Sequence, residues 1–398
     1  MSRERDRVGV VATGPTQWET PFFRHLRTHS ALDPYVFYGS RLGLGDEVES
    51  ESGIRVHFDL PELLEGHDYA FVGPGENPID AFERVHGARP LDAMVVEGHV
   101  GRLQRAALAW TRRRRVPAIY RSDSTLLYRM PAWKKVAKRM LLPLFFRRFP
   151  TFLPLSTPAA DYLRHYGVGA DRIFVSPYML DHDWYAAEAA RWRASSRALR
   201  VELALDRFDH VVLAILRFED RENPLEFLRA AASLKGSRPG LGFVLIGDGR
   251  RASTVREFVE REHLDQVVLP GYLPLSSLPR YYAVADVFVH PAVEECWGLS
   301  VNEAMASSVP VVVSTGVGCR FDLLPSSEFG LVYPLGNGKA LVEAILALVD
   351  DPERARAVAA RAKERVAGYG YALAAESFER AVRRARRAPG SATGTEAT

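Results

Sequence analysis

The chain has 398 residues, and at about 150 residues per domain this length predicts two to three domains. Hydrophobic residues make up 47% and charged residues 25%, a balance that is typical of a globular protein and excludes a disordered or fibrous chain. The formal net charge of +3 is too small to favour nucleic-acid binding.

The first half of the chain alternates short β-branched runs with helical stretches. The first run, 8–12, is followed by a break that contains Gly14, and then by a helix that begins near Pro21. Further strands are predicted at 35–38, 93–96 and 117–120. Alternating strands and helices favour a parallel, doubly wound sheet.

The second half repeats this pattern. Strands are predicted at 211–216, 242–246, 267–269, 287–289 and 309–313, with helices at 224–234 and 252–262. An Ala/Arg/Glu-rich stretch, 186–205, is compatible with a helical connector between the halves.

These elements predict an α/β fold of two Rossmann-like, doubly wound domains that face a central cleft. The predicted domains are 1–185 and 186–370, followed by a helix over 371–387 that can cross back to the first domain and a disordered tail, 388–398. In such sheets ligands bind beyond the carboxyl ends of the strands, so functional residues are expected at strand ends.

Neither a membrane span nor a secretion signal is predicted. The longest apolar run, 140–146, contains Pro143 and is far shorter than the roughly 20 residues that a bilayer requires. Residues 1–7 are mostly charged and lead into a strand without an apolar segment. The two cysteines are too few for a disulfide framework or a four-ligand zinc site. A reduced, cytoplasmic protein is expected.

The segment 102–148 is strongly basic, with Asp123 as its one acid. Within it, cations and apolar residues alternate at helical spacing over 133–146, with Lys134, Lys135, Lys138 and Arg139 as the cations. This pattern suits the surface of an anionic membrane, so a peripheral position at the inner face is one expectation. The alternative is a solvated helix whose apolar stripe packs on its own domain.

The densest cluster of functional signals is 290–306. It places a strand end, a loop with Gly298 and a helix start in quick succession, and such a helix start attracts anions, typically phosphate. Glu295 and Glu303 can face one cleft as acceptors for ligand hydroxyls. The alternative for Glu303 is a capping box, Ser300-Val301-Asn302-Glu303, which would explain this glutamate without a ligand.

These residues resemble the donor-binding signature of family-4 retaining glycosyltransferases of GT-B fold. The motifs are Glu295-x7-Glu303, Glu303-Ala304-Met305-Ala306 and Val309-Pro310-Val311-Val312-Val313-Ser314. Supporting matches in the second half are Arg217, Asn223-Pro224, Gly247-Asp248-Gly249, Pro270-Gly271-Tyr272, 281–286, Asp322-Leu323-Leu324 and 330–334. In the first half, 177–181 and 57–66 match more loosely, so the resemblance covers roughly residues 8–385.

The resemblance implies a role for each matching residue. It implies that Glu303 binds the ribose hydroxyls of a nucleotide, that Glu295 contacts the transferred sugar and that Arg217 lies on the diphosphate. The backbone N–H groups of Trp297, Gly298 and Leu299 are expected to face the sugar or diphosphate, and Gly247 and Tyr272 join the same nucleotide-sugar site. No metal and no cofactor are expected beyond the nucleotide-sugar co-substrate.

The chain departs from the family pattern at two positions. Family members commonly carry a lysine about five residues after the arginine, where this chain has Glu222. A carboxylate there opposes a diphosphate, so either Arg221 substitutes for the lysine, or the loop is rebuilt, or activity is impaired. The family's first-domain histidine has its counterpart near Asp123, which is a candidate proton acceptor or sugar ligand.

Two further first-domain residues are candidates. His99 follows a predicted strand, and Gly14 allows a backbone to approach a phosphate. A lone histidine is more often a packed or capping residue, and an ordinary turn explains the glycine equally well.

The sequence therefore predicts a retaining, metal-independent glycosyltransferase. The first domain is expected to bind a saccharide, lipid-linked or small-molecule acceptor, and the second domain the nucleotide-sugar donor. The catalytic candidates are Glu295, Arg217, Asp123 and His99. The alternatives are an epimerase or pseudo-glycosyltransferase on the same fold, or a non-catalytic protein that binds the membrane surface.

Overall fold

The computed structural model describes residues 5–45, 58–59 and 62–388, which divide into two compact units. Unit 1 contains the described residues up to 45 together with 62–179 and 369–388, and unit 2 contains 58–59 and 180–368. The predicted boundary after residue 185 falls inside helix α6 (His182–Arg193), which packs against other helices of unit 2. All but the first residue of the predicted tail, 388–398, lies outside the described residues.

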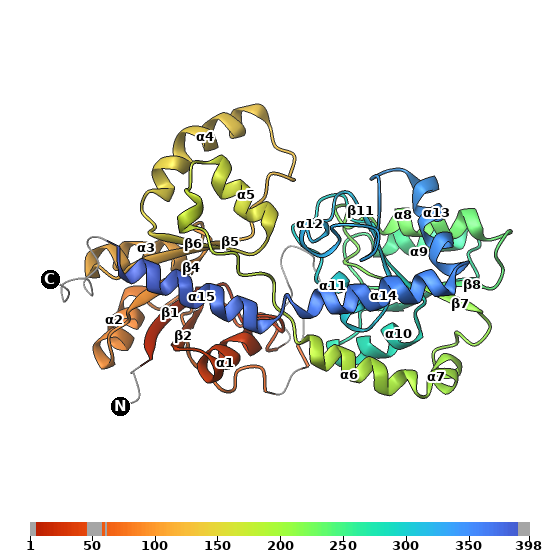
Figure 1. Cartoon of the computed structure of the whole chain (residues 1–398), viewed down its shortest axis with the longest axis horizontal. Helices are drawn as coiled ribbons and strands as arrows, with labels where there is room; N and C mark the ends of the chain where they lie inside the picture. The colour runs from red at the N-terminus through yellow and green to blue at the C-terminus, as the bar shows by residue number, and fades with distance from the viewer. Residues whose placement is uncertain (1–4, 46–57, 60–61, 389–398) are drawn as a thin grey trace. The chain divides into compact units, whose positions relative to one another are not determined.

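Unit 1 is a six-stranded parallel sheet covered by helices (Figure 1). Its strand order is β3-β2-β1-β4-β5-β6. The strands are β1 (Asp6–Ala12), β2 (Leu32–Tyr38), β3 (Asp68–Phe71), β4 (Ala93–Glu97), β5 (Ala118–Ser122) and β6 (Thr151–Pro154). The helices are α1 (Thr20–His29), α2 (Pro78–Ala88), α3 (Arg102–Arg114), α4 (Ala132–Phe146), α5 (Thr157–His165), the 3-10 turn η1 (Ala170–Arg172) and α15 (Tyr371–Arg386).

Strand β1 shows why this sheet is covered on both faces. Val8 and Val10 belong to a core that α1 and α15 complete, whereas Val11 belongs to a core on the other face with α2 and α3. Successive side chains of a strand point to opposite faces, so a continuous apolar run fills both cores.

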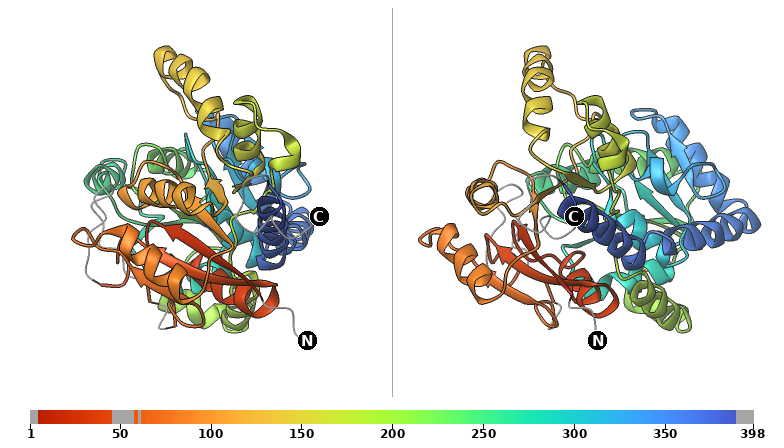
Figure 2. Two further views of the ribbon diagram at one scale, coloured as in Figure 1. Left: turned by 90° about the vertical axis from the view of Figure 1, so that its left-hand side faces the viewer. Right: turned by 60° about the vertical axis from the view of Figure 1, so that its left-hand side comes forward.

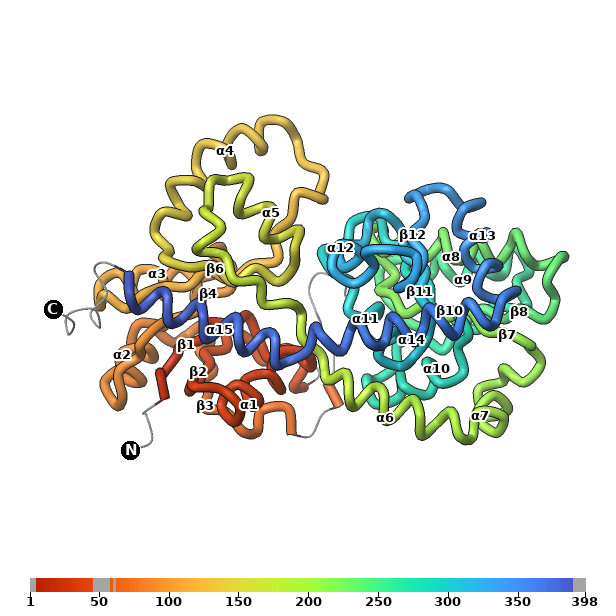
Figure 3. Tube along the Cα trace, in the orientation of Figure 1, coloured from red at the N-terminus to blue at the C-terminus, as the bar shows by residue number. Residues whose placement is uncertain are grey.

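The last helix, α15, packs on unit 1 although it follows all of unit 2 in sequence. Ser377 Oγ donates to the carbonyl of Val175 at 2.6 Å, and Thr151 Oγ1 donates to the carbonyl of Ala381 at 3.2 Å. Figures 2 and 3 show α15 lying along this unit. Helix α15 thus completes the core to which β1 contributes Val8 and Val10.

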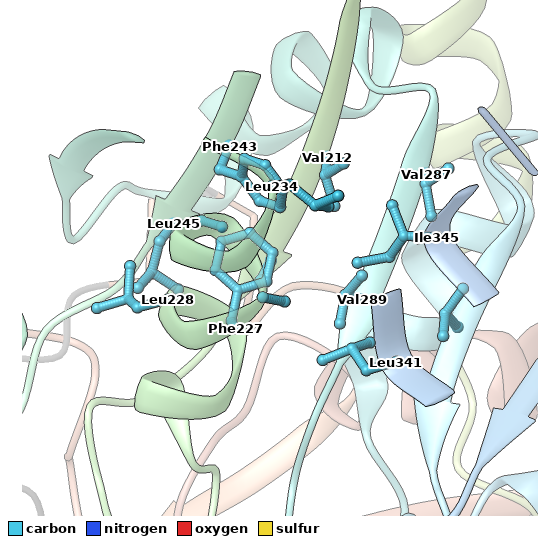
Figure 4. Close-up of a cluster of buried hydrophobic side chains, with 14 of the residues drawn as sticks. Val212, Phe227, Leu228, Leu234, Phe243, Leu245, Val287, Val289, Leu341 and Ile345 are labelled. Carbon is cyan, nitrogen blue, oxygen red and sulfur yellow. The ribbon is translucent and has the colours of Figure 1, made fainter. Parts of the chain in front are cut away.

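Unit 2 repeats the architecture with strand order β12-β11-β10-β7-β8-β9, all parallel. The strands are β7 (His210–Ile215), β8 (Leu241–Ile246), β9 (Val267–Gly271), β10 (Val287–His290), β11 (Val311–Ser314) and β12 (Leu331–Tyr333). The helices, besides α6, are α7 (Ser196–Glu202), α8 (Pro224–Leu234), α9 (Ala252–Arg261), the 3-10 turn η2 (Leu275–Ser277), α10 (Leu278–Val284), α11 (Leu299–Ala306), α12 (Arg320–Leu323), α13 (Gly338–Val349) and α14 (Pro352–Ala367). Figure 4 shows how side chains of α8 and α13 fill the core beside β7, β8 and β10.

Both units have the same switch in strand order. The first strand lies between the second and fourth strands, so β1 separates β2 from β4 and β7 separates β8 from β10. Ligands of doubly wound sheets bind outside the carboxyl ends of the strands at this switch. The loops after β1 and β4, and those after β7 and β10, are therefore the places to search for a site.

Within the part of the chain that the structure describes, no helix is long and apolar enough to span a bilayer.

Candidate functional site

The loops after β7 and β10 are bonded to each other in unit 2. The carbonyl of Arg221 accepts a hydrogen bond from the backbone N–H of Val293 at 2.7 Å. Asn223 adopts a left-handed conformation, with φ of 55°, and its side chain donates to the carbonyl of Pro291 at 3.5 Å. The residues predicted on these two loops therefore share one site at the strand switch.

Arg221 lies between two carboxylates in this site. Its Nη1 is 3.5 Å from Glu295 Oε2, and its Nη2 is 3.6 Å from Glu222 Oε1. The buried carboxylate of Glu222 also accepts the backbone N–H of Arg217 at 2.7 Å, and burial together with the charge of Glu295 raises its pKa to about 7. Glu222 is therefore built into the loop, where it holds Arg217 and Arg221 in place.

Glu303 is not part of a capping box. Helix α11 begins at Leu299, and its N-cap is Gly298 with φ of 99°, so Ser300 already lies inside the helix. Glu303 is buried one turn further along, where its Oε2 accepts a hydrogen bond from Tyr282 Oη at 2.7 Å. Burial raises the pKa of Glu303. Tyr282 fixes the carboxylate, and the capping interpretation of this residue is wrong.

A buried polar chain holds the start of α11. Trp297 Nε1 donates to Asn302 Oδ1 at 2.8 Å, and Asn302 Nδ2 is 3.4 Å from His182 Nε2 at the beginning of α6. Burial lowers the pKa of His182 to about 4, so this histidine is neutral at pH 7. The indole of Trp297 is thus structural, whereas the N–H groups of Gly298 and Leu299 stand at a helix start, where backbone donors have no intrahelical partner.

Glycines let the backbone segments of this site approach closely. Gly247 has φ of 146°, and a Cβ there would clash with the carbonyl oxygen of Leu216. Close packing therefore explains this glycine, and its predicted ligand contact stays a prediction. Tyr272 lies exposed just beyond β9, whose last residue accepts the N–H of Gly247 at 3.0 Å.

Gly316 and Gly318, in the turn after β11, were not among the predicted site residues. A Cβ on either residue would clash with carbonyl oxygens of the loop 292–296, which carries Glu295. The backbone N–H of Glu295 donates to the carbonyl of Gly316 at 3.1 Å. The signal in the sequence was a second Gly-x-Gly, Gly316-Val317-Gly318, which begins two residues after a buried strand.

The strand switch of unit 1 holds a hollow of about 710 Å³, lined by residues that follow β1, β4 and β5. His99 and Asp123 both line it. His99 Nδ1 is 2.9 Å from Tyr120 Oη, and burial together with the charge of Lys138 lowers the pKa of His99. Tyr178 Oη donates to Asp123 Oδ2 at 3.0 Å.

Gly14 is not among the residues that line this hollow, although a Cβ at Gly14 would lie 3.3 Å from the carbonyl oxygen of Ser40, which does line it. Its predicted contact with a phosphate stays a prediction.

A buried charge cluster beside the same hollow was also missed; two of its three residues, Glu97 and Arg121, line the hollow. The guanidinium of Arg121, 1% exposed, pairs with the carboxylates of both Glu19 and Glu97. Burial and the charge of Asp123 raise the pKa of Glu97 to about 8. The contact of Glu19 with Arg121 joins residues that are far apart in sequence, so no local pattern predicts it. Glu97 at the end of β4 and Asp123 directly after β5 were visible in the sequence as acids at this edge of the sheet.

Each half of the chain matches a family of known proteins. Residues 4–179 match the glycosyl transferase 4-like domain, and residues 195–365 match glycosyl transferases group 1. The chain belongs to the family-4 type of glycosyltransferases with the GT-B fold. The predicted family is thereby confirmed, as is the predicted fold of two Rossmann-like domains.

Curated relatives of this glycosyltransferase family align with part of the chain. A 2-deoxystreptamine N-acetyl-D-glucosaminyltransferase from Streptomyces fradiae is 37% identical over 158 residues, which are 39% of this chain and 36% of the relative. A D-inositol 3-phosphate glycosyltransferase from Pseudarthrobacter chlorophenolicus is 30% identical over 58% of this chain and 55% of the relative. The chain thus spans between a third and just over half of the length of these relatives.

Solved structures share the fold over nearly the whole chain. A glycosyltransferase from Rickettsia africae has a TM-score of 0.76 at 13% identity, covering 96% of this chain and 99% of that one. Anabaena HepE in complex with UDP and glucose has a TM-score of 0.70 at 15% identity, covering 94% and 98%. At these identities the likeness concerns the fold alone.

Proposed function

We propose that this protein transfers a sugar from a nucleoside-diphosphate sugar in unit 2 to an acceptor in unit 1. The observation that carries the proposal is the unit 2 site, where Arg217 and Arg221 accompany Glu295 and Glu303 beside the start of α11. Guanidinium groups and a helix start attract phosphate, and buried carboxylates accept hydrogen bonds from hydroxyls. A nucleotide sugar combines these two chemistries.

In the proposed reaction, departure of the diphosphate is the difficult step. As the bond from the sugar to the β-phosphate oxygen breaks, negative charge grows on that phosphate. Arg217, Arg221 and the N–H groups of Gly298 and Leu299 stabilise this charge. Glu222 and Glu295 hold the side chain of Arg221 before the reaction begins, and Glu222 holds the backbone of Arg217. Because these groups supply the positive charge, the proposed transfer needs no metal and no cofactor, and we propose that it retains the sugar's anomeric configuration.

The proposal predicts selective nucleotide binding. In a thermal-shift panel of UDP, GDP, TDP and ADP, one diphosphate is expected to raise the melting temperature equally with and without Mg²⁺, because a ligand of the folded state stabilises it by mass action. No shift with any of the four would refute the donor site. Product analysis with a labelled donor then separates transfer to an acceptor from epimerisation, the alternative on the same fold.

The charge of the unit 1 hollow narrows the acceptor class. Its lining includes Asp123, Glu97 and Arg121, and the guanidinium of Arg121 is already paired with Glu97 and Glu19. The other lining cation, Arg102, donates to backbone carbonyls of the loop 73–76. The carboxylate of Asp123 attracts an ammonium group, and both lining guanidinium groups are already bonded to protein groups. We therefore propose an amine-bearing polyol or saccharide acceptor, as in the name of the Streptomyces relative, rather than a phosphorylated one.

Matched cyclitols test this acceptor class. With the donor nucleotide sugar that the panel identifies, kcat/KM is expected to be at least about tenfold higher for scyllo-inosamine than for scyllo-inositol, and lowest for inositol 1-phosphate. Asp123→Asn is expected to remove most of the amine preference while leaving the nucleotide thermal shift unchanged. A preference for the phosphate would reverse the assignment of the acceptor and leave the donor site standing.

A further inference from the structure

Helix α4 of unit 1 presents large apolar side chains to solvent. Five of its apolar residues are exposed to between 58% and 69%, namely Trp133, Val136, Met140, Leu141 and Leu144. Of its 15 residues only Phe146 is buried. The alternative in which this apolar stripe packs on its own domain therefore fails for most of the helix.

The exposed residues form a stripe because of their spacing. Trp133, Val136, Met140 and Leu144 follow one another at intervals of three or four residues, so they lie on one side of the helix. Leu142 and Phe145 lie off this stripe and pack on the aromatic core around Tyr120. The core fixes the end of α4, and Figure 2 shows the rest of the helix projecting from unit 1.

Cations accompany this stripe, and no acid balances them. Lys134, Lys135, Lys138 and Arg139 belong to the helix, and the sequence has no Asp or Glu between Ser124 and Arg148. An exposed helix that is merely solvated usually carries both signs of charge in i,i+4 pairs. Here a large apolar face coincides with charge of one sign.

The positive surface continues past the end of α4. A hollow of about 830 Å³ is lined by six arginines, and among the described residues that line it there is no acid. Those arginines are Arg112, Arg115, Arg147, Arg148, Arg172 and Arg384. Arg172 donates to backbone carbonyls and Arg384 pairs with Asp171, whereas the first four are exposed.

We propose that unit 1 docks on an anionic lipid bilayer through α4, with the apolar stripe at the boundary of headgroups and acyl chains and the cations on lipid phosphates. Apolar area and electrostatic attraction are the two contributions that hold such helices at a membrane surface. A second copy of this chain fits the face poorly, because it would bring like charges together. The docking itself does not depend on the proposed function.

Vesicle co-sedimentation of the full chain tests the docking. Binding is expected to vesicles of phosphatidylcholine with 30% phosphatidylglycerol, to fall strongly when salt is raised, and to be absent with phosphatidylcholine alone. Met140→Ser with Leu144→Ser is expected to lower the partition coefficient at least about tenfold. Lys134→Gln and Lys135→Gln are each expected to lower the partition coefficient about fivefold.

Matched substitutions outside the face serve as controls. Val201→Ser on α7 removes an aliphatic side chain that is 61% exposed, and Arg354→Gln with Arg356→Gln removes two cations from α14. All three are expected to leave vesicle binding unchanged, and every variant is expected to keep the nucleotide thermal shift, which reports unit 2. Equal binding to neutral vesicles, or α4 variants that bind like the controls, would overturn the docking. The docking would also be overturned if the protein self-associated and the same α4 variants abolished that self-association, because a second copy would then occupy the face. Vesicle binding without any nucleotide shift would instead reject the proposed function and leave the docking intact.

Discussion

Arg217→Ala is expected to lower kcat by about 10²–10³-fold while changing nucleotide affinity far less. The side chain of Arg217 is exposed at the carboxyl end of β7, and its backbone N–H is held by Glu222 at 2.7 Å. A positive group beside a leaving group gains most of its interaction as charge develops, and loss of one such group lowers the rate by that factor. The measurement is steady-state kinetics beside the nucleotide thermal shift.

A matched arginine separates this role from a general loss of charge. Arg229 on α8 is exposed, and Arg229→Ala is expected to leave kcat within about twofold. Arg217→Lys restores charge without the planar fork and is expected to recover only part of kcat. An Arg217→Ala enzyme with unchanged kcat and a raised KM would mean that Arg217 binds donor and transition state equally, which would remove it from the catalytic group.

The loop after β7 contains an arrangement that the sequence alone did not predict. The family pattern that the sequence resembles has a lysine at the position of Glu222, so from the sequence this carboxylate was expected to oppose a phosphate. The left-handed residue Asn223 folds the loop so that this carboxylate meets the N–H of Arg217 and the side chain of Arg221. No local pattern encodes that arrangement, because it depends on backbone dihedral angles and on the neighbouring loop.

Some strands were predictable from the sequence and others were not. The central strands β7 and β8 were predictable because nearly every residue in them is buried, which gives continuous apolar runs. The edge strand β3 (Asp68–Phe71) was missed because none of its residues is buried, and β12 (Leu331–Tyr333) because it has only three residues. The cluster of Glu19, Glu97 and Arg121 was not predicted for another reason, because its three residues come from separate parts of the fold.

The two interpretations of Glu303 differed only in where α11 begins. A capping box needs Ser300 before the helix, and the start of the helix at Leu299 excludes it. Helix boundaries are the least certain part of any sequence-based prediction, so the spacing of residues could not decide between the two. Once the start is known, Glu303 is a buried carboxylate that interacts with a tyrosine from another helix.

Glu303→Ala is accordingly expected to weaken nucleotide binding about 10²-fold. Two hydroxyls of a ribose would lose a charged acceptor, at about 1.5 kcal/mol or more for each hydrogen bond. The same substitution leaves Tyr282 Oη buried without this acceptor, so the melting temperature of the free protein is expected to fall as well. Isothermal titration with the nucleotide, on protein shown to be folded, measures the first effect, and a melting curve measures the second.

Two further variants decide whether binding or folding is the cause. Glu303→Gln keeps an acceptor for Tyr282 and is expected to restore the melting temperature, but not the affinity, because its amide offers one acceptor oxygen where the carboxylate offered two. Tyr282→Phe removes the hydroxyl and leaves the carboxylate, so affinity is expected to drop much less than in Glu303→Ala. If Glu303→Ala bound nucleotide as tightly as the unmodified protein, its contact with Tyr282 would be a structural bond between α10 and α11, and the hydroxyl acceptors of the donor would have to be sought elsewhere in unit 2.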